Sequence, residues 1–282
     1  MKKFLAIALA ALMLFALAAC GGTSESKEVV KVIDINLTEE EYAFGVDKAQ
    51  PELLEKTNAF IEKIMKDGTF DEICNKYFGD GEPTAVTSAE LDESKDQLVV
   101  ATNAAFEPFE YTQGDKYYGI DMEIAALLAQ ELGKELVISN MDFDAVCLSV
   151  GQHKCDIAMA GLTVKEDRKE HVDFTSTYYQ ASQKLIVKAD DTTFDACTDA
   201  ASVEAILKGF DNTTKIGVQN GTTGNFYVKG DADWGFDGFA TECVGYKNGA
   251  LAVQDLVNGN INYVVIDAAP AACIVESINE VA

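Results

Sequence analysis

The chain has 282 residues, 48% of them hydrophobic, which is enough for one large folded unit or two smaller ones. Its 22 basic and 47 acidic residues give a formal net charge of −25 at pH 7. This charge argues against a nucleic-acid partner, because a phosphate backbone binds basic surfaces. It equally disfavours attachment to a membrane surface through a basic patch.

The first residues have the features of a sorting signal. Two lysines precede an uncharged apolar run that ends at Ala19 and is short for a membrane-spanning helix. Small residues followed by Cys20 resemble the lipobox of bacterial lipoproteins, in which this cysteine is acylated and becomes the mature N-terminus. We therefore expect a signal peptide at 1–19 and a tether at 20–28 whose acyl chains anchor the protein in the bilayer, outside a bacterial cell. An ordinary secretory signal with an unrelated cysteine is the alternative.

The rest of the chain shows a helical stretch, a linker and then alternating strands and helices. Apolar residues recur at helical spacing over 51–77, with a break at Gly68. An acidic segment without periodicity predicts a linker at 81–97. Strands are predicted at 29–35, 97–102, 135–139, 157–160, 185–187, 215–218 and 263–266, and helices at 122–132, 201–207, 250–257 and 270–277. This alternation predicts an α/β fold with parallel sheets.

Six cysteines follow the predicted lipid-attachment site: Cys74, Cys147, Cys155, Cys197, Cys243 and Cys273. Outside the cytosol disulfides are permitted, and buried free thiols are the equal alternative in a protein of this size. The cysteines form no C-x-x-C pair and the chain has two histidines. We therefore expect neither a metal site nor a cofactor.

Several segments resemble the extracytoplasmic solute-binding proteins of polar amino-acid ABC transporters, family 3. They are the stretches 101–110, 119–123, 156–163, 166–168, 218–223 and 265–267, in the family's order. The resemblance implies a two-lobed, periplasmic-binding-protein-like fold of type II, in which each lobe is a mostly parallel sheet with flanking helices.

One departure from the family concerns the order of its segments. Residues 42–79 resemble the family's C-terminal segment, although they precede all the other motifs. This order predicts a circular permutation in which the linker at 81–97 joins the family's usual termini. Lobe one would then comprise 42–80 and 98–186, lobe two 29–37 and 190–282, with crossings near 38–42 and 187–190. The alternative is a domain-swapped oligomer, in which the early segment completes a neighbouring molecule.

The resemblance also implies a set of ligand-binding residues. Arg168 matches the arginine that grips a ligand carboxylate, and Thr163 and Thr223 match positions that complete this grip. Asp267 matches the carboxylate that receives the ligand ammonium, together with the carbonyl of Gly161. Without the resemblance, each of these residues has an ordinary structural explanation, such as a solvated helix face or a helix cap.

Three further residues concern the ligand side chain. Phe106 and Phe143 match the apolar walls on either side of it. Asn103 occupies a position at which relatives with cationic ligands often carry an acid, so a neutral polar or aromatic amino acid is expected.

The expected function is that of a lipid-anchored receptor, which binds a free amino acid between two lobes and delivers it to an ABC transporter permease. We expect a monomer without catalytic residues. A sensor or partner-presenting lipoprotein of the same fold is the first alternative. An enzyme that resembles the cyclohexadienyl dehydratases, with Glu107 or Glu110 as its general acid, is the second.

Overall fold

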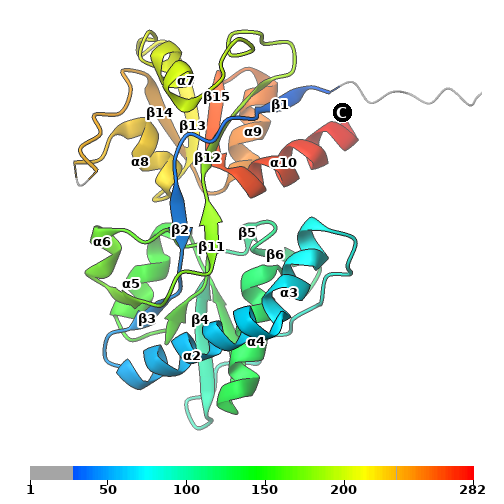
Figure 1. Ribbon diagram of the computed structural model, residues 1–282, viewed down its shortest axis with the longest axis vertical. Coiled ribbons are helices and arrows are strands. Elements are labelled where there is room, and N and C mark those ends of the chain that lie inside the picture. Colours follow the sequence, from blue (N-terminus) through cyan, green and yellow to red (C-terminus); the bar gives the residue numbers. More distant parts are fainter. Residues whose placement is uncertain (1–27, 233) are drawn as a thin grey trace, which may run out of the picture.

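The computed structural model of the chain describes residues 28–232 and 234–282. The predicted signal peptide, Cys20 and all of the tether except Glu28 lie outside the described residues. Figure 1 shows two bodies, one above the other, each with a sheet and helices packed against it. We call the lower body of this view lobe one and the upper body lobe two.

Lobe one is built on a five-stranded sheet with the order β10-β3-β9-β4-β8. Its strands are β3 (Gly45–Asp47), β4 (Gln97–Thr102), β8 (Glu135–Asn140), β9 (Ile157–Ala158) and β10 (Val172–Phe174). Its helices are α2 (Pro51–Asp67), α3 (Thr69–Phe78), α4 (Ile120–Leu132), α5 (Val146–Gly151), α6 (Glu166–Lys169) and the 3-10 turn η1 (Phe143–Ala145). A small sheet of β5 (Ala105–Phe106), β6 (Glu110–Gln113) and β7 (Lys116–Tyr118) lies beside them.

Lobe two is built on a second five-stranded sheet with the order β1-β12-β15-β13-β14. Its strands are β1 (Val30–Ile33), β12 (Gln183–Lys188), β13 (Lys215–Gln219), β14 (Glu242–Tyr246) and β15 (Tyr263–Asp267). Its helices are α7 (Ala200–Leu207), α8 (Thr223–Lys229), α9 (Gly249–Asn258) and α10 (Ala268–Val281).

Both sheets are mixed, so the expectation of mostly parallel sheets is wrong. In lobe one β4 is parallel to β8 and β9, whereas β3 is antiparallel to both of its neighbours. In lobe two β13 is parallel to β14 and β15, whereas β12 is antiparallel to β1 and β15. The antiparallel strands β3 and β12 follow directly on the segments that cross between the lobes. They therefore need no crossover helix, which a parallel neighbour would require.

Two short strands connect the lobes: β2 (Glu40–Tyr42) and β11 (Tyr179–Ala181), which pair in antiparallel fashion (Figure 1). The crossing expected at 187–190 is wrong. Residues 183–188 pair with β1 and β15, so they belong to the sheet of lobe two and lobe one ends before them.

Most of the predicted helices and strands are present. The helical stretch over 51–77 divides into α2 and α3 at Gly68, whose φ of 87° lies in the left-handed region that favours glycine. Gly133 ends α4 in the same conformation, as its place after the apolar run predicts. The helix α8 and the strand β14 were not predicted.

The first described residues lie against the last helix. The Asn279 side chain in α10 accepts hydrogen bonds from the backbone N–H groups of Val29 and Val30, at 2.9 and 3.2 Å. It also donates one to the Val30 carbonyl at 2.9 Å. The strand β1 and the helix α10 are therefore neighbours in lobe two, as Figure 1 shows.

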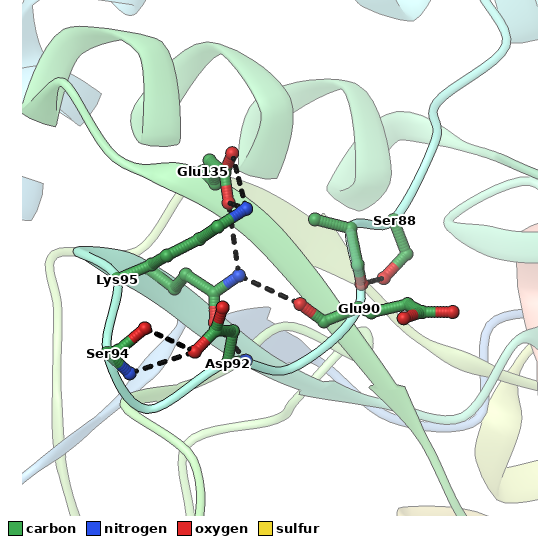
Figure 2. A network of polar contacts seen from close by, with 8 residues as sticks. Ser88, Glu90, Asp92, Ser94, Lys95 and Glu135 are labelled. Atoms are coloured by element: carbon green, nitrogen blue, oxygen red, sulfur yellow. Dashed lines mark hydrogen bonds and ion pairs between the residues drawn. The ribbon is translucent and has the colours of Figure 1, made fainter.

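The predicted linker is an ordered segment packed on lobe one. Val86 and Tyr117 exchange both backbone hydrogen bonds, at 2.8 and 3.0 Å. Further along, Ala89 donates to the Leu136 carbonyl at 2.8 Å. Figure 2 shows the turn that follows, in which Asp92 accepts from Ser94 and Lys95 pairs with Glu135. The segment covers the edge strand β8, which would otherwise expose unpaired backbone groups.

Candidate functional site

The two lobes are in direct contact beside the crossing strands β2 and β11. The contacts come from the loops that follow the parallel strands of each sheet. Gln219, at the end of β13, donates a hydrogen bond to the Asn103 side chain after β4 at 2.9 Å. The ammonium of Lys165 in lobe one lies 2.8 Å from the Asp231 carboxylate in lobe two. Loops at the carboxyl ends of parallel strands are a common place for ligand sites in α/β proteins.

Arg168 extends from α6 into this interface and is 7% exposed. Its guanidinium donates to the carbonyl of Thr163 at 2.7 Å in its own lobe and to the carbonyl of Gly221 at 3.0 Å in the other lobe. The Phe143 ring lies 5.2 Å from the guanidinium carbon. Within the described part of the chain Arg168 forms no ion pair, so its charge is held by neutral partners alone.

Thr163 and Thr223 meet across the interface, at 3.1 Å between their hydroxyl oxygens. Thr223 is the first residue of α8, and Thr163 lies in the loop before α6. The Thr163 hydroxyl also donates to the carboxylate of Glu40 at 2.6 Å. Both threonine hydroxyls are therefore part of one hydrogen-bonded chain that ends on the crossing strand β2.

Asp267 ends β15, precedes α10 and is 4% exposed. Its carboxylate accepts a hydrogen bond from the Tyr42 hydroxyl on β2. Burial raises the pKa of Asp267 to about 7, and the nearby charge of Glu40 adds to this rise. Hydrogen bonds from Tyr42 and Gln183 act in the opposite direction.

Gly161 packs against the rings of Tyr42 and Phe106. Its φ of 53° favours glycine, and a β carbon there would lie 3.0 Å from the Phe106 ring. Its N–H donates at 2.9 Å to the buried Asp121, whose pKa burial raises to about 7. Phe106 is itself buried, so this ring and the glycine backbone pack as one surface.

Both polar atoms of the Asn103 side chain have a hydrogen-bond partner. Its amide nitrogen donates to the Met141 carbonyl at 2.6 Å, and its oxygen accepts from Gln219. All eight predicted ligand-binding residues thus lie in or next to the contact region between the lobes.

Two cavities open beside this region. One of about 330 Å³ includes Arg168, Phe143 and Gly221 in its lining. The other, of about 710 Å³, is lined by Thr163, the acidic stretch 39–41 and Trp234, among others. A third cavity of about 690 Å³ lies between α3, α4 and the ordered linker, and none of the predicted ligand-binding residues lines it.

Sequence reasoning missed Glu40, Tyr42 and Gln219. The first two lie on β2, where the burial alternates: Glu40 and Tyr42 are buried and Glu41 is exposed. This period of two could have placed Glu40 and Tyr42 on one face. No signal in the sequence indicates that Gln219 reaches across to Asn103.

The two acids considered for catalysis lie apart from these contacts. Glu110 is completely buried, and neither of its carboxyl oxygens has a hydrogen-bond partner among the described residues. Burial raises its pKa well above the usual range, and the carboxyls of Asp121 and Asp267 add to this. Glu107 is exposed, and its pKa is also raised, first by partial desolvation and then by the charge of Glu276.

Three features are absent from residues 28–232 and 234–282. No group of His, Cys, Asp and Glu side chains has a geometry for a metal ion. No helix combines the length and the apolar character that crossing a membrane requires. The six cysteines in this part are free thiols.

Comparison with known proteins gives one family. The profile of the bacterial extracellular solute-binding proteins, family 3, matches residues 98–264. The arginine-binding periplasmic protein of Mannheimia haemolytica is 30% identical over 173 residues, which are 61% of this chain and 63% of that protein. The chain thus spans less than two thirds of the length of this curated relative.

Solved structures agree with this match. Two structures of an ancestral arginine-binding protein, one bound to arginine and one to glutamine, are 31% and 32% identical to this chain. Each covers 65% of this chain; the matched parts are 75% and 74% of those chains, with TM-scores of 0.55 and 0.54. These relatives are described as arginine-binding proteins.

Proposed function

This chain belongs to the bacterial extracellular solute-binding proteins of family 3, and from that premise we propose that it binds one free L-amino acid between its two lobes. The observation that carries this proposal is the pair of opposite charges in the contact region. Arg168 and Asp267 are both buried, and neither forms an ion pair with the described residues.

A zwitterionic amino acid has the charges that these two residues require. A buried charge costs several kcal/mol unless an opposite charge or hydrogen bonds compensate it. A ligand carboxylate on Arg168 and a ligand ammonium on Asp267 would compensate both at once. Because the contacts come from both lobes, the ligand binds the closed arrangement more tightly and so favours it.

We propose a neutral polar or aromatic amino acid as the ligand. Asn103 and Gln219 present amide groups at the interface, without a formal charge. Phe106 and Phe143 offer aromatic surfaces on two sides. Among the similar structures, the ancestral arginine-binding protein bound to glutamine supports a neutral ligand, whereas the arginine complex supports a cationic one.

We further propose that the fold is circularly permuted within one chain. The family profile begins at residue 98, yet β1 and β3 supply strands to both sheets. The neighbouring positions of β1 and α10, and a linker that leads from α3 to β4, support this arrangement. Light scattering of the purified protein should give a monomer mass. A dimer that exchanges residues 29–80 would contradict it.

The remaining proposals concern the cell. Cys20 would carry the acyl chains that hold the receptor outside the membrane, and the closed form would dock on an ABC transporter permease. Cys20→Ala should release the protein from the membrane fraction, and deletion of the protein should abolish uptake of its amino acid. Uptake that persists while another response to the amino acid is lost would favour the sensor alternative.

The binding proposal is tested by a thermal-shift screen against the standard amino acids, cystine and ornithine. A ligand at about 100 times its Kd adds about 2.7 kcal/mol to stability, which raises Tm by a few degrees. We expect one or a few L-amino acids to do so. No shift with any of them, from a protein that unfolds cooperatively, would contradict the proposal.

A further inference from the structure

Glu40 lies on a crossing strand, and its carboxyl group accepts hydrogen bonds from both lobes. It lies on β2, outside the residues that the family profile matches, and is 5% exposed. One carboxyl oxygen accepts from Thr38 at 2.6 Å and from Gln183 of lobe two at 3.1 Å. The other accepts from Thr163 of lobe one at 2.6 Å.

These bonds fix the direction of the hydroxyl chain. The Thr163 hydroxyl donates its proton to Glu40, whose carboxyl oxygens accept every hydrogen bond that the described residues make to them. Thr163 must then accept the hydrogen bond from Thr223, at 3.1 Å. The Thr163 oxygen therefore offers only lone pairs to a group that enters between the lobes. Lone pairs suit an ammonium and not a carboxylate.

Glu40 also adds charge beside Asp267. Glu40 on β2 raises the pKa of Asp267 and the Tyr42 hydroxyl on the same strand donates to it, whereas Asp267 in turn raises the pKa of Glu110 on β6. In the described part of the chain, neither Glu40 nor Asp267 forms an ion pair with a lysine or an arginine. A ligand ammonium would supply the opposite charge that these two buried carboxyl groups lack.

We propose that Glu40 is a positioning residue for the ammonium end of the site. It holds Thr163 and Thr223 in the direction that accepts an ammonium, and its charge makes Asp267 a stronger partner for that ammonium. This inference rests on the proposed amino-acid binding. It gives the crossing strand β2 a role in ligand binding in addition to its role in connecting the lobes.

The test is a comparison of Glu40→Gln with Glu41→Gln in the full chain. Glu41 is the next residue on β2 and is exposed; its carboxylate accepts from Gln180 at 2.7 Å, and its carbonyl accepts from the Val164 N–H at 3.1 Å. Isothermal titration calorimetry measures the affinity of each variant for L-glutamine and for L-arginine. The pH is varied between about 5.5 and 8.5, a range in which a buried carboxyl group with a raised pKa titrates.

Glu40→Gln should bind the responding amino acid roughly ten- to hundredfold more weakly at neutral pH, as for a lost charged hydrogen-bonding partner. The pH below which affinity falls should also move lower than in the native protein, because Asp267 no longer has a second negative charge beside it. Glu41→Gln should change neither property. If Glu40 has a purely structural role, Glu40→Gln lowers the affinity without moving this pH, and that result would overturn the proposal. Native affinity in Glu40→Gln would overturn it as well.

Two further variants separate this role from misfolding. Thr163→Val removes the hydroxyl that Glu40 orients, whereas Thr163→Ser keeps it. If Glu40 acts through Thr163, the valine variant binds weakly, the serine variant binds normally, and the Glu40→Gln effect is smaller in the valine background. Equal binding by both Thr163 variants would contradict the proposal, even if Glu40→Gln does not fold. If the native protein binds no amino acid of the screen, it is the proposed function that fails.

Discussion

The proposed site has a carboxylate end at Arg168 and an ammonium end at Asp267, and different kinds of residue surround the two. Arg168 is held by the carbonyl oxygens of Thr163 and Gly221. Asp267 lies instead among other acids, with Glu40 and Glu110 close enough to interact with it. The first end would give a ligand carboxylate a bidentate partner, and the second would give a ligand ammonium a carboxyl partner. A zwitterion would satisfy both ends.

The two ends also depend on different parts of the chain. Arg168 and its partners lie within residues 98–264, which the family profile matches. Asp267 follows that range, and both Tyr42 and Glu40 come from β2, before it. Changes on β2 should therefore affect the ammonium end and leave the carboxylate end intact.

The largest effect is expected at the carboxylate end. Arg168→Ala should cost about 2–5 kcal/mol of binding free energy, because it leaves a ligand carboxylate buried without its charge partner. Arg168→Lys should recover only part of this, since an ammonium cannot reproduce the planar fork. Lys169→Ala on the same helix, where the lysine pairs with Glu166 in solvent, is the matched control for calorimetry. A loss below about 1 kcal/mol for Arg168→Ala would place the carboxylate elsewhere.

The next effect concerns pH at the ammonium end. The pKa of Asp267 is raised to about 7, and only its ionised form pairs with an ammonium. Affinity should therefore be full above this pH and weaken as pH falls below it, by up to about tenfold per pH unit. Asp267→Asn should bind weakly and lose this dependence. Calorimetry over this pH range measures the affinity of both proteins. If the affinity of Asp267→Asn still falls at low pH, another group causes the pH dependence.

A smaller effect is expected at the side-chain position. Asn103→Asp can still accept from Gln219 but adds a negative charge and loses the bond to Met141. The ratio of L-arginine affinity to L-glutamine affinity should rise about tenfold, which is about 1.4 kcal/mol. Asn248→Asp adds the same charge at the cap of α9, where an aspartate also caps well, and should leave the ratio unchanged. An unchanged ratio in Asn103→Asp would remove this residue from the specificity argument.

The smallest effect on binding is expected in the ordered linker. The Gln97 side chain bonds to the backbone of Glu90 and Asp92 and to the Glu135 carboxylate. Gln97→Ala should lower the free energy of unfolding by about 1–3 kcal/mol, as measured by urea denaturation, with native ligand affinity. Ser94→Ala loses one exposed contact in the same turn and should cost less. A tighter or weaker ligand affinity in Gln97→Ala would link the linker to the site.

The sequence predicts residues that belong to motifs with a fixed spacing better than residues outside such motifs. Arg168, Thr163 and Thr223 belong to these motifs, and the structure brings them together. Glu40 was missed because its partners Thr163 and Gln183 are far from it in the chain, and only the fold makes them neighbours.

The fold shows the same contrast. Long apolar runs and glycine caps predicted α2, α3 and α4. The assignment of β12 to lobe two depends on its pairing with β1 and β15, which local pattern does not determine. The helix α8 has seven residues and too few turns to show a clear period.

The most direct test of the account is a crystal structure of the protein with the amino acid that the thermal-shift screen identifies. The account predicts electron density between the lobes, with the ligand carboxylate on Arg168 and its ammonium on Asp267. A ligand bound in the cavity between α3 and α4, or one that points its carboxylate toward Asp267, would contradict the account.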